Sequence, residues 1–470
     1  MASIERTVYP RIKQNFSKTE LIDFYSPTED EIRFVQKTTR REETQFHLLI
    51  LLKTFQKLGY FPNLEEIPDS LLKFLRRALR FNIGVLPLVA RNTQFLQQAK
   101  VLEFLKVKRF DEIARKILVR TVYEKAQVMD NPADLINVAI EILIKEQYEL
   151  PAFSTIDRLV KRIRTLVNRR LWNQILHRLT SEKTVQLDNL LQPDPKSYRT
   201  PYNSLKQLPK KPTLKHLQEL LTHLEWLQGL GEFSIVLQNI PPLKIKHFAG
   251  EAKVLDAAEM KDFKEPKRMA LLVCLVYRAQ IKTRDALAQM FIRRIAKMHR
   301  DGKTALQKIQ LKHLEKSEKL VAIFSGILQN VDLSQTDAEV GQTLKSILGK
   351  QDLPTLVEEC ELLSAFHGNN YFLLLWKLYR SHRSALFRLL TSLEFKSTNQ
   401  DDSMIKALEF LIANENRKSE FLEPTVDLSF AEEKWREIIL KMVDGNSFYD
   451  RKLFEVCVFS HLAQELKSGD

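Results

Sequence analysis

The chain has 470 residues, of which 44% are hydrophobic, and it carries a formal net charge of +14 at pH 7. This length and apolar content exclude a disordered tail and are typical of a globular protein with several domains, since one domain usually has about 100–200 residues. The surplus of positive charge favours a polyanionic partner, most often nucleic acid, although ribosome-associated and membrane-surface proteins share this bias.

Helical periodicity runs along most of the sequence, and glycine is scarce, with 12 residues in 470. We therefore predict an all-α, multi-domain fold with helix-turn-helix-like modules followed by long helices. In the first block, residues 1–85, Ser17 opens a capping box and Ser26 is the expected N-cap of the next helix. A longer helix over 42–58 should end at Gly59. Short helices with tight turns have the size of an N-terminal helical DNA-binding module.

The last helix of this block, in "PDSLLKFLRRALR", has two different faces. Leucines form an apolar stripe on one side, and basic residues lie largely opposite. This pattern predicts a DNA-facing helix, whereas the alternative is a solvated charged face on a core helix. The candidate DNA-binding residues here are Lys73, Arg76, Arg77 and Arg80.

The second block, residues 86–190, is predicted to form another helix-turn-helix-like DNA-binding module. Asn131 is the expected N-cap of one helix, Pro151 breaks the chain after it, and Ser154 begins the next. A helix, a short turn and a capped basic helix form the layout of a DNA-reading helix-turn-helix. The predicted helices lie near 92–106, 110–128, 132–148 and 154–179.

The helix predicted over 154–179 carries an unusual density of positive charge. Seven basic residues and one acid, Asp157, lie between Phe153 and Thr180. A long basic face repels itself unless a polyanion neutralises it, so phosphate contacts with some base contacts are expected; the alternative is a solvated helix paired with acids elsewhere. The expected apolar face contains Ile156, Leu159, Val160, Ile163, Leu166 and Val167. The candidate DNA-binding residues are Thr155, Arg158, Lys161, Arg162, Thr165, Arg169 and Arg170.

The rest of the chain divides into three further predicted regions. Residues 191–213 contain five prolines and read as an extended Pro/Lys-rich linker. Within it, Lys210 and Lys211 either follow a DNA backbone or belong to a bare spacer. Residues 214–349 are expected to form a long-helix arm or dimerisation region, with the apolar segment "EPKRMALLVCLVYRAQ" buried. Residues 350–470 are predicted to be helical again.

Sequence motifs for enzymatic or metal chemistry are missing. There is no phosphate-binding glycine-rich loop, and no zinc-protease, serine-hydrolase or kinase motif. Cys274, Cys360 and Cys457 lie far apart and form no metal or disulfide pattern, which fits a reducing cytoplasm. No signal peptide or membrane-spanning segment is predicted. The 59 acids are spread over the helices, and their spacing neither favours nor rules out a catalytic carboxylate cluster. We expect no metal or cofactor in this chain, and no membrane association.

Several long strings of the sequence resemble the Tn-three family of bacterial replicative transposases. They span essentially the whole chain and occur in the same order. They are "PTEDEIRFVQKTTR", "LLILLKTFQKLGYFP", "DLINVAIEILIKEQYELPAFSTIDRLVKRIRTLVNRR", "TPYNSLKQLPKKPT", "YRSHRSALFRLL" and "FEVCVFSHLAQELKSGD".

The resemblance implies a function for each part of the protein. Family members bind the terminal inverted repeats of their transposon through N-terminal helical modules, and a helical middle region supports a homodimer. A later RNase-H-like domain holds an Asp-Asp-Glu triad that binds Mg²⁺, nicks the transposon ends and joins them to target DNA. Members continue well beyond the string that ends this chain at Asp470. We therefore expect a chain cut short before the triad, with no enzymatic activity of its own.

The sequence thus predicts specific binding of double-stranded DNA, at transposon inverted repeats, by the N-terminal part of a replicative transposase in the bacterial cytoplasm. Two alternatives stay open. The chain is either a natural truncated product that inhibits full-length transposase, or a helical RNA-binding or scaffold protein, which the charge alone allows.

Overall fold

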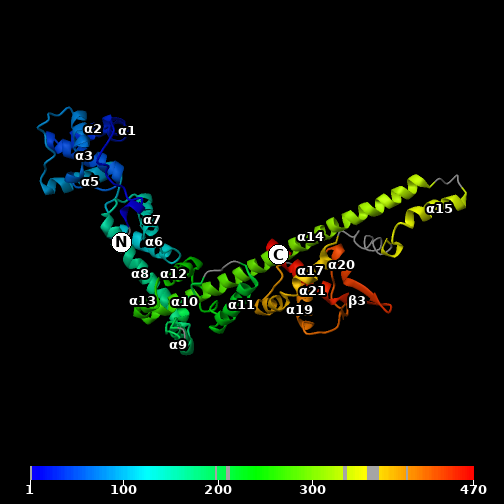
Figure 1. Ribbon diagram of the computed structural model, residues 1–470. Coiled ribbons are helices and arrows are strands. Elements are labelled where there is room, and N and C mark those ends of the chain that lie inside the picture. Colours follow the sequence, from blue (N-terminus) through cyan, green and yellow to red (C-terminus); the bar gives the residue numbers. More distant parts are fainter. Residues whose placement is uncertain are drawn as a thin grey trace. The chain divides into compact units, whose positions relative to one another are not determined.

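The protein was examined as a computed structural model, which describes residues 3–195, 198–207, 212–331, 336–356, 370–398 and 401–469, without the side chains of 312–316. It divides into two compact units, each described separately below. Unit 1 comprises Met1–Lys206 with Glu232–Arg278, and unit 2 comprises Gln207–Gly231 with Ala279–Asp470. Most of the described residues are helical, so the all-α prediction is confirmed (Figure 1).

The N-terminal part of unit 1 is built around one helix, α3, whose largely apolar middle has no solvent-facing side. Residues 46–52 of this helix are all buried, His47 among them. As predicted, Gly59 ends α3 in a left-handed conformation with φ of 71°. The elements are η1 (Ile4–Arg6), α1 (Lys18–Tyr25), α2 (Glu29–Thr38), α3 (Glu42–Leu58), η2 (Leu64–Glu66), α4 (Asp69–Ala78) and α5 (Arg91–Leu105).

Two predicted helix starts in this region have different outcomes. The capping box at Ser17 is confirmed, since its hydroxyl accepts from the Glu20 amide. The start at Ser26 is wrong, because α2 begins at Glu29 with Thr28 as its N-cap. The Thr28 hydroxyl accepts from the Glu31 amide while the Glu31 carboxylate accepts from the Thr28 amide, and this reciprocal pair fixes the start two residues later.

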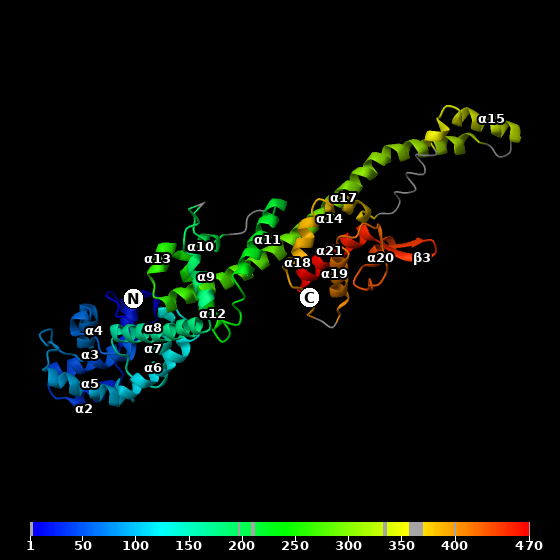
Figure 2. The same ribbon diagram turned by 90° about the horizontal axis from the view of Figure 1, so that it is seen from below.

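The second part of unit 1 packs α6, α7 and α8 against one another, and Figure 2 shows them side by side. Asn131 caps α7 as predicted, accepting from the Ala133 amide. The start of α8 differs from the prediction, because Ala152 and not Ser154 is its N-cap. The elements are α6 (Glu112–Ala126), α7 (Pro132–Lys145), α8 (Phe153–His177), α9 (Ser181–Asn189), α10 (Pro201–Ser204), α12 (Pro242–Val254) and α13 (Ala257–Asp262).

The turn before α8 is tied to the end of α3. The Leu150 amide donates to the Gly59 carbonyl oxygen at 2.8 Å, and the Tyr9 hydroxyl donates to the Pro151 carbonyl oxygen at 3.1 Å. The Tyr9 ring also stacks on Tyr60 and meets Phe153 edge-on, with centroids 5.3 and 5.5 Å apart. The first turn of α8 is therefore anchored to the N-terminal helices of the same unit.

The structure differs from the predicted extended linker over the part that it describes before residue 207. Thr200 and the proline after it open the short helix α10, and Tyr202 is fully buried. The Tyr202 hydroxyl donates to the carbonyl oxygen of Ala252, which fixes this segment within unit 1. The buried Tyr202 side chain thus holds this segment in unit 1 despite its high proline content. Lys210 and Lys211 lie outside the described residues.

One continuous helix, α14 (Glu265–Asn330), lies in the middle region, where the sequence predicts a long-helix arm or dimerisation region. Its apolar stretch is buried as predicted, with Met269, Cys274 and Val276 fully inaccessible. The helix supplies residues to both units. No proline or helix-ending glycine motif interrupts it, and Gly302 lies inside it facing the Tyr371 and Leu375 side chains.

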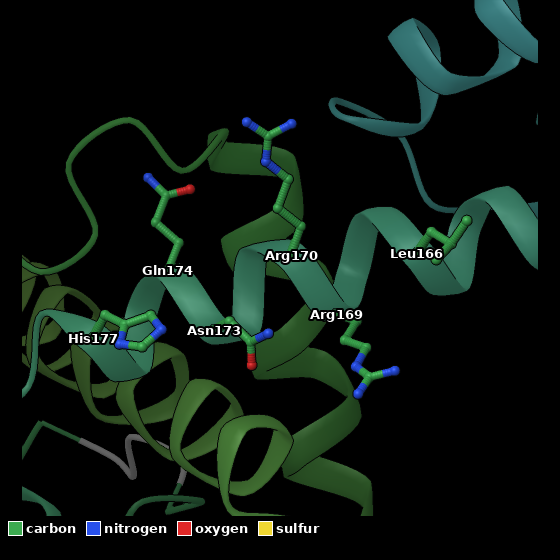
Figure 3. A pocket seen from close by; sticks show the side chains of 6 residues that line it. All are labelled: Leu166, Arg169, Arg170, Asn173, Gln174 and His177. Atoms are coloured by element: carbon green, nitrogen blue, oxygen red, sulfur yellow. The ribbon is translucent and has the colours of Figure 1, made fainter.

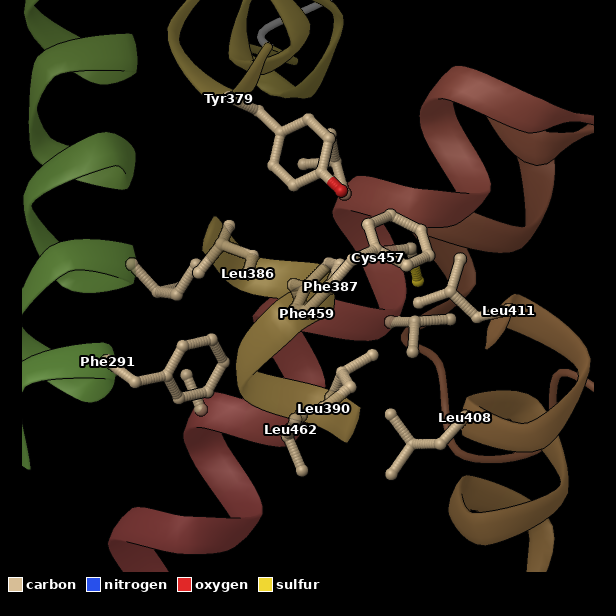
Figure 4. Close-up of a cluster of buried hydrophobic side chains, with 14 of the residues drawn as sticks. Phe291, Tyr379, Leu386, Phe387, Leu390, Leu408, Leu411, Cys457, Phe459 and Leu462 are labelled. Carbon is tan, nitrogen blue, oxygen red and sulfur yellow. The ribbon is translucent and has the colours of Figure 1, made fainter. Parts of the chain in front are cut away.

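Unit 2 has a core of aromatic and leucine side chains around α21 (Figure 4). Phe459 of this helix contacts the rings of Phe291, Tyr379 and Phe387, with centroids 5.7–6.2 Å apart. Beside this core, Arg383 donates to both carboxylate oxygens of buried Glu455. The helices are α11 (Leu214–Gly229), α15 (Asp337–Leu348), α17 (Phe372–Tyr379), α18 (Arg383–Ser392), α19 (Ser403–Ala413), α20 (Glu433–Ile439) and α21 (Arg451–Ser468).

A small antiparallel sheet interrupts the region predicted to be helical throughout. Its strands β1 (Phe421–Leu422), β2 (Leu440–Val443) and β3 (Asn446–Asp450) pair in the order β1-β3-β2. Asp444 and Gly445 form the two-residue turn between β2 and β3, with φ of 49° and 77°. An Asp-Gly pair adopts such positive φ values readily, so the chain turns back here and β3 pairs with β2.

Replacing Phe459 with alanine should destabilise unit 2 by about 3–5 kcal/mol, because a large buried side chain leaves a cavity that its neighbours cannot fill. Thermal unfolding followed by circular dichroism should show one transition moving to lower temperature. Met442→Ala is the matched control, because Met442 is 67% exposed. Equal shifts for both variants would contradict the assigned core.

Candidate nucleic-acid interface

Helix α8 has a buried apolar side that packs in unit 1 and an exposed basic side. The spacing of three and four residues places a stripe of aliphatic side chains against α6 and α7. Leu166 departs from the predicted apolar face, because it is 56% exposed and lies beside Arg169 and Arg170. The buried aliphatic residues are Ile156, Val160, Ile163, Val167, Leu171 and Ile175.

The exposed side of α8 carries most of the residues that the sequence singles out. Arg158, Lys161, Arg162, Arg169 and Arg170 are exposed, as is Thr165. Four of these basic side chains have no ion pair with an acid in the part of the chain that the structure describes. They are Arg158, Lys161, Arg162 and Arg169. The one acid of the helix, Asp157, is buried and is absent from this side.

Two predicted site residues on α8 are less available than the others. Thr155 is half-buried. The Thr165 hydroxyl donates to the Lys161 carbonyl oxygen at 2.9 Å, which leaves it only as a hydrogen-bond acceptor. Phosphate oxygens need donors, so Thr165 is a weaker phosphate ligand than its basic neighbours.

A shallow depression lies along the C-terminal half of α8 (Figure 3). Arg169 and Arg170 leave the helix in different directions, and Arg170 donates to the Tyr123 hydroxyl at 2.8 Å. The basic surface is therefore broad, and one of its arginines is already oriented by a neighbouring helix. The depression is lined by Leu166, Arg169, Arg170, Asn173, Gln174 and His177.

A buried polar cluster holds α8 in place from its other side. We call it the Asp130 cluster, which consists of Asp130, Arg164, Asn168, Lys244 and His247. The Lys244 ammonium donates to Asp130 Oδ1 at 2.5 Å and to Asn168 Oδ1 at 2.8 Å, and the Asn168 amide donates to Asp130 Oδ1 at 2.8 Å. His247 Nε2 lies 2.9 Å from Asp130 Oδ2, and Arg164 Nε lies 3.7 Å from it.

In the Asp130 cluster, the buried negative charge of Asp130 and the buried positive charge of Lys244 stabilise each other. Burial disfavours the Asp130 carboxylate, but hydrogen bonds from His247, Lys244 and Asn168 outweigh it and hold its pKa well below the usual range. Burial lowers the pKa of Lys244, while Asp130 opposes that shift. Lys244 is fully inaccessible, so removal of either partner leaves an unpaired buried charge.

The second predicted basic helix, α4, presents fewer basic side chains than expected. Lys73, Arg77 and Arg80 are exposed, whereas Arg76 is half-buried with its guanidinium 5.1 Å from the centroid of the Phe46 ring. Helix α4 packs on α1 and α3, and α8 packs on α6 and α7. The predicted site residues therefore gather in two separate helical clusters of unit 1.

The described ranges contain neither a metal-binding cluster nor a membrane-spanning helix. No group of three or more His, Cys, Asp or Glu side chains there is placed to hold a metal ion. Nor does any helix in those ranges combine the length and apolar character needed to cross a bilayer.

Sequence comparisons show which known proteins the chain is similar to. Residues 1–163 match a family described as a domain of unknown function, DUF4158. Over 458 residues, the chain is 22% identical to the transposase for transposon Tn1546 of Enterococcus faecium, covering 95% of this chain and 46% of that protein. It is 23% identical to the transposase for transposon Tn501 of Pseudomonas aeruginosa, covering 97% of the chain and 46% of the relative.

These relatives are transposases, and the similarity extends along nearly the whole chain. The transposase for transposon gamma-delta of Escherichia coli is 20% identical, over 97% of this chain and 47% of its own length. The chain is accordingly similar to transposases along nearly its whole length. It spans about half the length of the relatives that it matches.

Replacing Lys244 with methionine should destabilise unit 1 by about 3–5 kcal/mol, because it leaves the Asp130 carboxylate buried without its ammonium partner. Chemical unfolding monitored by circular dichroism measures this loss. Lys246→Met is the matched control on the same helix, since Lys246 is exposed. A Lys244→Met variant as stable as Lys246→Met would show that the Asp130 cluster does not support α8.

Proposed function

We propose that this chain is the DNA-binding, N-terminal part of a replicative transposase, and that it recognises the terminal inverted repeats of its transposon. Two helix-turn-helix-like modules of unit 1 would contact duplex DNA, one through α8 and the other through α4. The full-length protein would work as a homodimer in the bacterial cytoplasm. Its Mg²⁺-dependent strand cutting and joining would use residues outside this chain, so we assign no catalytic residue here.

The proposal depends mainly on the exposed basic side of α8, which carries no acid. The opposite side of the same helix is held in place by packing and by the Asp130 cluster. Arg158, Lys161, Arg162 and Arg169 lie along this helix without ion-pair partners in the described residues. A 25-residue helix is about 37 Å long, at about 1.5 Å per residue. Such a helix is long enough to follow the phosphates of a duplex groove over several base pairs.

The anchoring of α8 favours specific over non-specific binding. The Asp130 cluster fixes the middle of the helix, and Tyr9 with the Leu150 amide fixes its beginning. A rigid helix presents its side chains in one register, which base-edge contacts require. A mobile basic segment would bind any polyanion with similar affinity.

The test is a salt-titrated binding assay on duplex DNA that carries the terminal inverted repeat, with scrambled duplex and RNA as competitors. If the chain neutralises about six phosphates, log K should fall with log salt at a slope of about −5. A strong preference for the repeat supports end recognition. Equal binding to all three nucleic acids would contradict it and favour a purely electrostatic or RNA-binding surface.

Replacing both Arg162 and Arg169 with alanine should weaken binding and reduce the magnitude of the salt slope by about two, since each removed phosphate contact reduces it by about 0.9. The matched control is Arg293→Ala with Arg300→Ala, two exposed arginines on α14 in unit 2. Arg294 is unsuitable for this control because it donates to the Pro212 carbonyl oxygen at 3.0 Å. Equal losses in both double variants would remove α8 from the interface.

A further inference from the structure

Residues 79–90 connect α4 to α5 (Figure 2). This connection combines exposed apolar side chains with a strongly basic setting. No acidic residue occurs between Ser70 and Leu102. Exposed arginines stand at both ends of the connection, with Arg80 near its start and Arg91 directly after it. The basic residues of the stretch 70–102 are Lys73, Arg76, Arg77, Arg80, Arg91 and Lys100.

Three apolar side chains in this connection face solvent although the segment itself is anchored. Ile83 is 87% exposed, Leu86 52% and Leu88 72%. Phe81 and Val85 pack against the hydrophobic core around α3, and the Val85 amide donates to the Asn82 carbonyl oxygen at 3.1 Å. The connection is therefore held at its base while its apolar side chains project outward.

The local conformation explains this arrangement. From Val85 to Ala90 the chain forms no helix or strand, and half-buried residues alternate with exposed ones. Pro87, between the two exposed leucines, restricts the backbone and stiffens the segment. The exposed leucines are thus presented by a stiff segment, so little conformational freedom is lost when they are covered.

Charge decides which partner suits this surface. A partner protein with an apolar surface would face four or more cations of this chain and no acid. Such a charged surrounding is unfavourable for most protein–protein contacts. Duplex DNA satisfies both features at once, because its phosphates pair with the arginines and its stacked bases offer apolar faces. Architectural DNA-binding proteins insert Leu, Ile or Pro side chains between base pairs in this way and bend the duplex.

We propose that the connection between α4 and α5 is a DNA-bending wedge. Ile83 and Leu88 enter a base step of the duplex while Arg80 and Arg91 contact the flanking phosphates. The proposal rests on the proposed DNA-binding function and adds to it a mode of deformation. It also assigns to the N-terminal cluster a role distinct from that of α8, since bending gives specificity at bases that are not hydrogen-bonded.

The experiment compares the full chain with its Ile83→Ser, Leu88→Ser double variant. The probe is a duplex enriched by the full chain from a random-sequence library, end-labelled for energy transfer and carrying 2-aminopurine at successive positions. The wild-type chain should bend this duplex by about 20–90° and raise 2-aminopurine fluorescence at one step. The double variant should keep the salt slope but lose the fluorescence rise and most of the bend.

The matched control carries serine at Val185 and Ile235, which are 61% and 74% exposed elsewhere in unit 1, and it should bend DNA as the wild type does. A bend that persists in the Ile83/Leu88 variant would overturn the wedge while leaving DNA binding intact. Light scattering also compares the mass of the wild-type chain with that of the Ile83/Leu88 variant, both without DNA. A lower mass for the variant would overturn the wedge in favour of self-association through these side chains. Failure of the wild-type chain to prefer duplex DNA over RNA would instead refute the underlying DNA-binding function.

Discussion

The contact of Lys244 with Asp130 and Asn168 is the constraint on which the arrangement of the second helical cluster depends. It joins three parts of the chain: the end of the α6–α7 connection, the middle of α8 and the first turn of α12. Burial of these groups is costly, and each is stabilised only by the others. Because their geometry is specific, the cluster selects one register of α8 where aliphatic packing alone would accept several.

Contacts on the buried side of α8 offset the charge repulsion on the exposed side of the same helix. Adjacent guanidinium groups without acids between them raise the free energy of the free protein. Aliphatic packing of α8 against α6 and α7, the Asp130 cluster and the Tyr9 contacts offset this cost. We infer that the charge is retained for a polyanionic ligand, because an acid at any exposed position of the helix would otherwise relieve the repulsion.

Sequence patterns predicted those features that depend on local chemistry. The capping box at Ser17, the cap at Asn131 and the left-handed end of α3 at Gly59 follow from residues a few positions apart. The two faces of α8 follow from its periodicity, apart from Leu166. An Asp-Gly pair at 444–445 also signals the β2–β3 hairpin locally, and the helical interpretation of that region overlooked it.

Features that depend on distant partners could not be read from the sequence. Lys244 lies in "LKIKHFAG" between ordinary neighbours, and its burial follows only from Asp130 being brought close by the fold. Similarly, Tyr202 lies in a proline-rich segment that resembles a linker until α12 supplies the carbonyl oxygen for its hydroxyl. The sequence pattern of α4 did not distinguish Arg76 from its exposed basic neighbours, but the Arg76 guanidinium lies over the Phe46 ring of α3.

The central claim is that duplex DNA covers the exposed basic side of α8. Arginine modification by phenylglyoxal, mapped by mass spectrometry with and without inverted-repeat duplex, tests it most directly. The account predicts that DNA protects Arg158, Arg162 and Arg169 while Arg293 on α14 stays equally reactive. Unchanged modification of the three α8 arginines in the presence of saturating duplex would contradict the account.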